Sequence, residues 1–427
     1  MADGGVTLGV PRLHRLANGV TVVCDPIAGI ESFALSVVVG RGARWEDEAR
    51  SGWSHLLEHM VFKGAGGRSA LQIVEAIEGQ GGSINAATGY ERTSFQVRAL
   101  KGSLDLAMTT TADLVLRPAL DEDELVREKD VVAQEIAEAE DTPDDHVFEM
   151  AQTAAYEGQP LGRPILGEVH TVNAADRAGL EDWRARIYAP DRLVVAASGA
   201  VDEDELLALA ERHFQGAAGP AVEEPAIGRF VGGVRTDARK LEQAHLVFLL
   251  PGPGARDPDY YALRLFAEVL GGGMSSRLFQ EAREKRGLAY SIDAWSDTYA
   301  DTGVLGVYAG AAPGNAAELA KVAADQIVSL ATRITPEELD RAKAQLKGHL
   351  FMAREAPLVR AEQAAGQVLL FGRLYTPAEI AAGIEMVTAA DIARLGGRLL
   401  NPKTSVASVL GPKSALAAAK GFRSALN

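Results

Sequence analysis

The segment from residue 54 to residue 64 reads Ser-His-Leu-Leu-Glu-His-Met-Val-Phe-Lys-Gly and carries two of the chain's eight histidines. Because His55 and His59 are four residues apart, both imidazoles lie on one face of a helix, one turn from each other. Glu58 falls on the edge of the same face, so a divalent metal held by both rings would have a carboxylate beside its open position. This is the H-x-x-E-H pattern, the inverted form of the H-E-x-x-H zinc motif.

The residues between the histidines indicate that this helix is buried. Leu56, Leu57 and Met60 are apolar, which is typical of a helix that packs against a core. The alternative is a pair of unrelated histidines on a solvated helix face, and the apolar neighbours disfavour it. We expect the helix to span residues 51–62, with Ser51 as its N-cap and Gly64 as its stop.

A catalytic zinc ion needs a third protein ligand in addition to two histidines. An acidic segment, residues 121–139, is predicted to be helical, and its opening carboxylates suit a helix N-terminus. In and just after it lie the carboxylates Glu122, Glu124, Glu128, Glu135, Glu138 and Glu140. Glu128 and Glu135 are seven residues apart and share a face, but spacing alone does not choose the ligand among these residues.

Length and charge exclude several classes of function. The chain has 427 residues, 43 Lys and Arg against 58 Asp and Glu, and a net charge of −15, so we expect two or three domains. The negative charge argues against nucleic acid and against an anionic membrane surface as partners. The one cysteine, Cys24, excludes an intrachain disulfide. No secretory signal and no apolar run of about 20 residues is visible, so we expect a cytoplasmic protein.

The chain repeats itself at offsets of 208 to 215 residues. The matching phrases are Gly42-Ala43-Arg44 with Gly254-Ala255-Arg256, residues 83–86 with 291–294, residues 161–163 with 371–373, and residues 172–176 with 387–391. Four pairs in the same order indicate a tandem duplication. We therefore predict an N-terminal domain over 1–214, a Gly-, Ala-, Pro- and Glu-rich linker over 215–228, and a homologous C-terminal domain over 229–427.

Within the first repeat the pattern predicts strands followed by helices. Strands are expected at 19–24, 33–39, 93–97 and 193–198, and further helices at 70–78 and 104–116. The short connections between them favour an α+β fold, in which each domain is a sandwich of one sheet backed by helices.

Residues 54–64, together with Arg127-Glu-Lys-Asp-Val-Val-Ala-Gln-Glu135, resemble the pitrilysin/insulinase family of zinc metallopeptidases, most closely its bacterial members that are similar to the mitochondrial processing peptidase. In that family the third ligand is a glutamate about 76 residues after the second histidine, which selects Glu135. The resemblance implies one Zn²⁺ per chain held by His55, His59 and Glu135, with Glu58 as general base. It also implies that Glu128 orients a group bound to the metal.

The second half of the chain contains a sequence motif of its own. Residues 271–279, Gly-Gly-Gly-Met-Ser-Ser-Arg-Leu-Phe, lead to residues 283–290, and the latter resemble the family's C-terminal Arg and Tyr. That resemblance implies that Arg283 and Tyr290 contact the substrate from the far wall of a chamber; the alternative is a glycine-rich turn before a charged helix end. The position that answers His55 lies near Ala267, so the second half is expected to bind no metal.

Residues 82–87, Gly-Ser-Ile-Asn-Ala-Ala, resemble the family strand that pairs with the substrate backbone, which implies a binding role for Asn85 and Ala86. The resemblance covers the whole chain and implies two domains that face each other across a chamber. It implies an endopeptidase acting on peptides or unfolded polypeptides.

Because both sets of site residues lie on this chain, no distinct catalytic partner is needed, and a homodimer is expected to enclose substrate. The alternative is a non-catalytic assembly subunit of the same fold, which would be expected to have lost at least one of His55, Glu58, His59 and Glu135.

Overall fold

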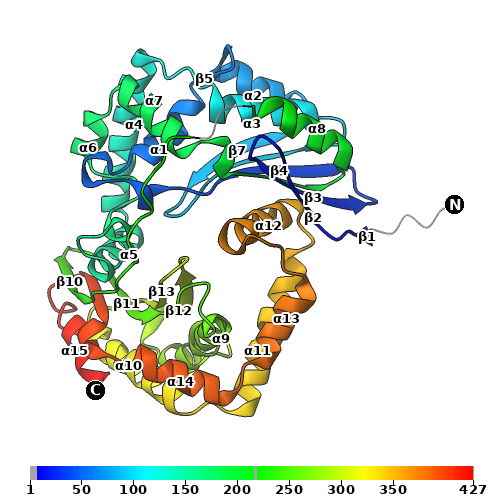
Figure 1. Ribbon diagram of the computed structural model, residues 1–427. Helices are drawn as coiled ribbons and strands as arrows, with labels where there is room; N and C mark the ends of the chain where they lie inside the picture. The colour runs from blue at the N-terminus through cyan, green and yellow to red at the C-terminus, as the bar shows by residue number, and fades with distance from the viewer. Residues whose placement is uncertain (1–6, 216–218, 427) are drawn as a thin grey trace. The chain divides into compact units, whose positions relative to one another are not determined.

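The computed structural model describes residues 7–215 and 219–426, and it divides into two compact units (Figure 1). Neither unit is continuous in the sequence. Unit 1 consists of Met1–Ile136, Pro164–Pro225 and Met352–Thr376, and unit 2 of Ala137–Arg163, Ala226–Phe351 and Pro377–Asn427. Each unit therefore takes a segment from the other half of the chain.

Unit 1 is built on a mixed sheet with the strand order β1-β3-β9-β4-β8-β7, and β2 pairs with β3. The strands are β1 (Thr7–Leu8), β2 (Arg12–Arg15), β3 (Thr21–Ala28), β4 (Ser32–Val39), β7 (Ser83–Thr88), β8 (Thr93–Leu100) and β9 (Leu193–Gly199). β3 and β9 run parallel, and the other neighbours are antiparallel. The strands predicted at 19–24, 33–39, 93–97 and 193–198 are confirmed as β3, β4, β8 and β9.

Helices cover one face of this sheet. They are α1 (Trp53–Val61), α2 (Ala70–Glu78), α3 (Leu104–Leu116), α4 (Glu122–Asp141), α6 (Val169–Ala174), α7 (Arg177–Ile187) and α8 (Glu203–His213), and a short hairpin, β5 (Gly64–Ala65) with β6 (Arg68–Ser69), follows α1. Alternate residues of β4, namely Phe33, Leu35, Val37 and Val39, enter the main core of unit 1, as the period of a strand requires. The predicted sheet backed by helices is confirmed.

The opposite face of the same sheet is covered by α12 (Pro357–Phe371), a helix from the second half of the chain (Figure 1). Its side chains Ala361, Ala364, Ala365 and Val368 form a second apolar cluster with alternate residues of the central strands, such as Val38. Their spacing places them on one side of the helix, and the small alanines allow the helix to lie close to the sheet. The central strands are therefore buried on both faces.

A buried ion pair fixes α12 to β3. Arg360 donates from Nε to Asp25 Oδ2 at 2.5 Å, and Ser198 Oγ donates to the same oxygen at 2.8 Å. Both charged side chains are only 1% exposed. A buried charge is tolerated only when it is paired and hydrogen-bonded, so each of these two residues requires the other.

Unit 2 repeats the arrangement with the strand order β10-β14-β11-β13-β12. Its strands are β10 (Gly233–Ala238), β11 (Ala244–Gly252), β12 (Ala289–Thr298), β13 (Gly303–Ala311) and β14 (Val406–Gly411). Its helices are α5 (Pro143–Ala155), α9 (Tyr260–Gly271), α10 (Ala316–Thr332), α11 (Pro336–Ala353), α13 (Pro377–Met386), α14 (Ala389–Leu399) and α15 (Ala418–Ala425).

The sheet of unit 2 is also covered on both faces. From the first half of the chain, α5 lays Phe148 on Tyr308, with ring centroids 5.4 Å apart. Tyr308 pairs with Val247 on β11, so the next residue, Phe248, points to the other face. There it stacks on Phe422 of α15 at 3.9 Å. The exchange of helices is therefore reciprocal: α12 belongs to unit 1 and α5 to unit 2.

The expected linker, residues 215–228, lies partly outside the described residues, because 216–218 are not described. Residues 219–232 form neither helix nor strand. The boundaries expected at 214 and 229 concern the sequence repeat and stay a prediction, whereas the compact units follow the exchanged helices. No helix in the described part of the chain combines the length and the hydrophobicity needed to cross a membrane.

The ion pair between α12 and β3 gives a stability prediction. Replacing Arg360 with Met leaves the Asp25 carboxylate buried without its cation, which should lower the free energy of unfolding by about 3–5 kcal/mol. The double variant Asp25→Leu, Arg360→Met should recover most of that loss. Arg186→Met, which removes an exposed pair with Asp182, is the control and should cost about 0–1 kcal/mol. Urea titrations measure the free energy of unfolding of each variant. Equal losses for Arg360→Met and Arg186→Met would contradict the prediction.

Candidate metal centre

The helix that carries the two histidines begins at a glycine. Gly52 is the N-cap of α1, with φ at +89°, and not Ser51 as the sequence predicted. The left-handed backbone at this position favours glycine. The carboxylate of Glu46 supplies the missing cap, because it accepts hydrogen bonds from the backbone N–H of Gly52 at 2.8 Å and of Ser54 at 2.6 Å. A buried acid from the preceding loop thus satisfies the start of the helix.

His55 and His59 lie one turn apart on α1, as predicted, with ring centroids 4.6 Å apart. Both side chains are largely buried. Burial, reinforced by the neighbouring His59, lowers the pKa of His55 to about 4. At neutral pH His55 is therefore an uncharged imidazole, which is the form that binds metal ions.

Glu135 on α4 brings its carboxylate to both rings. Its Oε2 atom lies 3.7 Å from Nε2 of His55 and 3.5 Å from Nε2 of His59. The ligand atoms of the three residues all fall within 4.8 Å of one another. For comparison, neighbouring ligand atoms around a tetrahedral zinc ion are separated by about 3.3 Å. Glu135 Oε2 is also buried without a hydrogen-bond partner among the described residues. An unpartnered oxygen between two imidazole nitrogens fits a bound cation.

Glu128, one heptad before Glu135, reaches the other side of His59. His59 Nδ1 lies 3.1 Å from Glu128 Oε2, and the Glu128 side chain is only 5% exposed. If the Nδ1 proton points to this carboxylate, the lone pair of Nε2 is left free and faces Glu135. The structure therefore places Glu128 where it can orient His59.

Glu58 lies on the same helix with its carboxyl group buried. Burial raises the pKa of Glu58, and hydrogen bonds from the side chain and backbone of Thr88 act in the opposite direction. Its Oε2 atom is buried and has no hydrogen-bond partner in the part of the chain that the structure describes. The Glu58 carboxylate is therefore held in place by Thr88, and its Oε2 atom can still accept a proton.

The strand that carries Thr88 also holds the two residues expected to bind substrate. Asn85 pairs with Gln96 and Ala86 pairs with Phe95, and both partners lie on β8. β7 ends the strand order, so its outer edge has no partner strand among the described residues. Such an edge offers unpaired backbone groups to an extended chain.

Arg283 and Tyr290 belong to unit 2. Arg283 is exposed on a π-helical segment, Phe279–Glu284, with its guanidinium 4.9 Å from the centre of the Phe279 ring. The neighbouring Lys285 and Arg286 both pair with Glu281, whereas no ion pair of Arg283 is found within the described ranges. Tyr290, at the start of β12, is 62% exposed. Both side chains therefore present donors to solvent.

Two family models match this chain. Residues 22–169 match the one described as insulinase, peptidase family M16, and residues 174–346 match the one described as the peptidase M16 inactive domain. Together the two ranges cover well over half of the sequence. The chain belongs to the insulinase family of peptidases.

Relatives within the insulinase family cover almost the whole chain. A Rickettsia felis protein named an uncharacterized zinc protease is 34% identical over 399 residues, which span 93% of this chain and 97% of the relative. A Mycobacterium tuberculosis protein, also named an uncharacterized zinc protease, is 36% identical over 417 residues, spanning 96% and 95%. The predicted family is confirmed.

Solved structures show the same fold. A protease from Helicobacter pylori aligns with a TM-score of 0.87 at 21% identity, covering 95% of this chain and all of that one (100%). A chain of Complex III2 from Candida albicans aligns with a TM-score of 0.84, also at 21% identity, covering 97% and 99%. At such identities the likeness concerns the fold.

The range that matches the model described as inactive, residues 174–346, contains no H-x-x-E-H motif. Among the described residues, His55, His59 and Glu135 are the one group of three or more metal-ligating side chains that converge.

Three residues around this centre were not predicted from the sequence. They are Glu46, Thr88 and Lys63, and the ammonium of Lys63 lies 2.6 Å from Glu128 Oε1. Lys63 had a local signal, because it follows His59 by four residues. Glu46 and Thr88 had none, because their contacts depend on how loop and strand fold onto α1.

The ligand set can be tested by counting metal. Glu135→Ala removes one of three converging ligand atoms and should lower the zinc content of the dialysed protein well below one per chain. Glu138→Ala, an exposed carboxylate three residues further along the same helix, should leave the content unchanged. Elemental analysis measures both, and the reverse result would assign the ligand to Glu138.

Proposed function

We propose that this chain is a zinc-dependent endopeptidase that hydrolyses peptides or unfolded polypeptide segments, with one Zn²⁺ per chain. The observation that carries the proposal is the convergence of His55, His59 and Glu135 beside the buried, partly unpartnered carboxylate of Glu58. Three protein ligands with a neighbouring base are the composition of a catalytic zinc site, in which the fourth position is left open. The names of the relatives support the same metal.

Each residue of the centre has a distinct role in this proposal. Zinc in such a site supplies Lewis acidity, which lowers the pKa of water toward about 7 and polarises a carbonyl group. Glu58 accepts the proton of the attacking water on its free oxygen and passes it to the leaving amine. Thr88 holds that carboxylate in place, and Glu128 holds the ring of His59.

We propose that substrate binds in an extended conformation along the outer edge of β7, next to Asn85 and Ala86. Backbone pairing of this kind accepts many sequences, because the hydrogen bonds come from main-chain groups. β7 also carries Thr88, so the strand that receives the peptide holds the general base. Cleavage within a chain follows naturally from edge pairing, since no terminus of the peptide needs to be recognised.

Arg283 and Tyr290 complete the proposal from unit 2. We propose that, within an enclosed chamber, they donate hydrogen bonds to the carbonyl that is attacked, where negative charge develops. Their exposure and the lack of an ion pair at Arg283 among the described residues support this role. Because both residue sets occur on one chain, we propose a homodimer in the cytoplasm without a distinct catalytic partner.

The second candidate is a non-catalytic assembly subunit of the same fold. The likeness to a chain of Complex III2 concerns the fold, and an assembly role has no use for a buried base with an unpartnered oxygen. This chain keeps His55, Glu58, His59 and Glu135, and the ligand atoms of His55, His59 and Glu135 lie within 4.8 Å of one another. The catalytic proposal is therefore favoured.

Glu58→Gln separates metal binding from catalysis. The amide cannot accept the proton, so turnover of an unfolded model protein should fall about 100- to 10,000-fold, while zinc content stays at the wild-type value. Peptide products detected by mass spectrometry measure turnover. Turnover at the wild-type rate in this variant would exclude Glu58 as the base.

Tyr290→Phe and Arg283→Met test the contribution of the second half. Loss of one donor to the developing negative charge should lower kcat about 100-fold, with zinc content unchanged in both variants. Arg286→Met is the matched control, because that guanidinium is already paired with Glu281. Equal rates for Arg283→Met and Arg286→Met would remove Arg283 from the mechanism.

A further inference from the structure

Lys63 contacts Glu128, which in turn contacts His59 of the candidate metal centre. The backbone N–H of Lys63 bonds to the carbonyl of Met60 at the end of α1, and its ammonium lies 2.6 Å from Glu128 Oε1. The other oxygen of the same carboxylate, Oε2, lies 3.1 Å from Nδ1 of His59. Lys63 lies in the turn that follows α1, four residues after His59, so the two residues contact the two oxygens of one glutamate.

We propose that Lys63 is a positioning residue for the metal centre, acting through Glu128 on His59. A glutamate carboxylate held at one oxygen still rotates about its last bond, because that torsion has a broad minimum. A second contact at the other oxygen fixes the plane of the group. The plane in turn sets the direction of the hydrogen bond to His59 and the aim of its Nε2 lone pair. This inference rests on the proposed zinc site.

Burial makes the contact with Lys63 important. The Glu128 side chain is 5% exposed and Lys63 is 32% exposed, so the carboxylate has little water to compensate its charge. The ammonium supplies that compensation from the surface side. Lys63 therefore stabilises the buried Glu128 carboxylate in its contact with His59, a proposed metal ligand.

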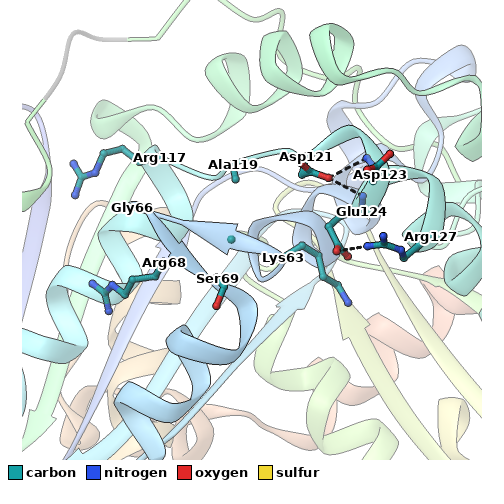
Figure 2. A pocket seen from close by; sticks show the side chains of 12 residues that line it. Lys63, Gly66, Arg68, Ser69, Arg117, Ala119, Asp121, Asp123, Glu124 and Arg127 are labelled. Atoms are coloured by element: carbon teal, nitrogen blue, oxygen red, sulfur yellow. Dashed lines mark hydrogen bonds and ion pairs between the residues drawn. The ribbon is translucent and has the colours of Figure 1, made fainter.

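Lys63 is one of the residues that line a pocket of about 550 Å³, and Figure 2 shows these lining side chains. Its other cationic lining residues pair with different carboxylates: Arg68 and Arg117 with Asp113, and Arg127 with Glu124. The dashed lines in Figure 2 join Arg127 to Glu124 but none reaches Lys63, whose partner Glu128 is not a lining residue. Arg127 is thus a control: a cation in the same pocket whose side chain pairs with Glu124 and forms no ion pair with Glu128 among the described residues.

The test is zinc affinity, measured on metal-depleted protein by competition with a chromophoric chelator. Lys63→Met should weaken zinc binding about 10- to 100-fold, and Lys63→Arg should restore most of the affinity. Arg127→Met should bind zinc as the wild type does. Circular dichroism and thermal melts of the metal-free variants check the fold, and Lys63→Gln replaces Lys63→Met in the comparison if the latter is unfolded.

A double-variant cycle distinguishes a role through Glu128 from a general loss of structure. Glu128→Gln should weaken zinc binding by itself, and adding Lys63→Met should then produce no further loss. Additive losses, or a Lys63→Met protein with wild-type affinity, would overturn the inference while leaving the proposed function intact. A wild-type protein that binds no zinc would instead overturn the proposed function.

Discussion

The proposed chemistry of this protein depends on the burial of one nine-residue helix. On α1 the side chains of Leu56, Leu57 and Met60 have no exposed surface, and they occupy the arc opposite His55, Glu58 and His59. The apolar arc fixes the rotation of the helix, so the polar arc must face α4 and β7. Rotation by one residue, about 100°, would point the imidazoles away from Glu135. The geometry of the candidate metal centre is thus a consequence of core packing.

The exchange of helices between the two halves of the chain holds the two sheets in place, as core packing holds α1. With α12 on one face and the main helices on the other, the central strands of unit 1 are buried on both sides. The reciprocal position of α5 gives the sheet of unit 2 the same protection. A sheet covered on both faces is a rigid support, and β7, at its edge, remains unpaired within the described ranges. The fold therefore combines a fixed scaffold with one strand edge that has no partner strand among the described residues.

Local signals predicted much of this structure. The helices at 70–78 and 104–116 have the expected bounds, and the first of them is marked by the Ser69 capping box at its start and by Gly79 at its end. The H-x-x-E-H spacing placed both imidazoles correctly, because only helix geometry was needed. By contrast, Asp25 and Arg360 are 335 residues apart in sequence, and no pattern in either segment indicates their pairing. The choice of Glu135 among many glutamates came from family resemblance, since spacing cannot tell which helix face is buried.

The charges around the centre support a divalent cation at this site. Three carboxylates, Glu58, Glu128 and Glu135, approach two imidazoles, and burial favours the neutral form of His55. Lys63 supplies one positive charge against these three groups. In a buried region the remaining two negative charges are costly, and burial accordingly raises the pKa of Glu58. A Zn²⁺ ion at the converging ligand atoms would balance the ionised carboxylates. The positive charge of that ion would also favour the ionised form of Glu58, which the proposed general base requires, next to an apolar core.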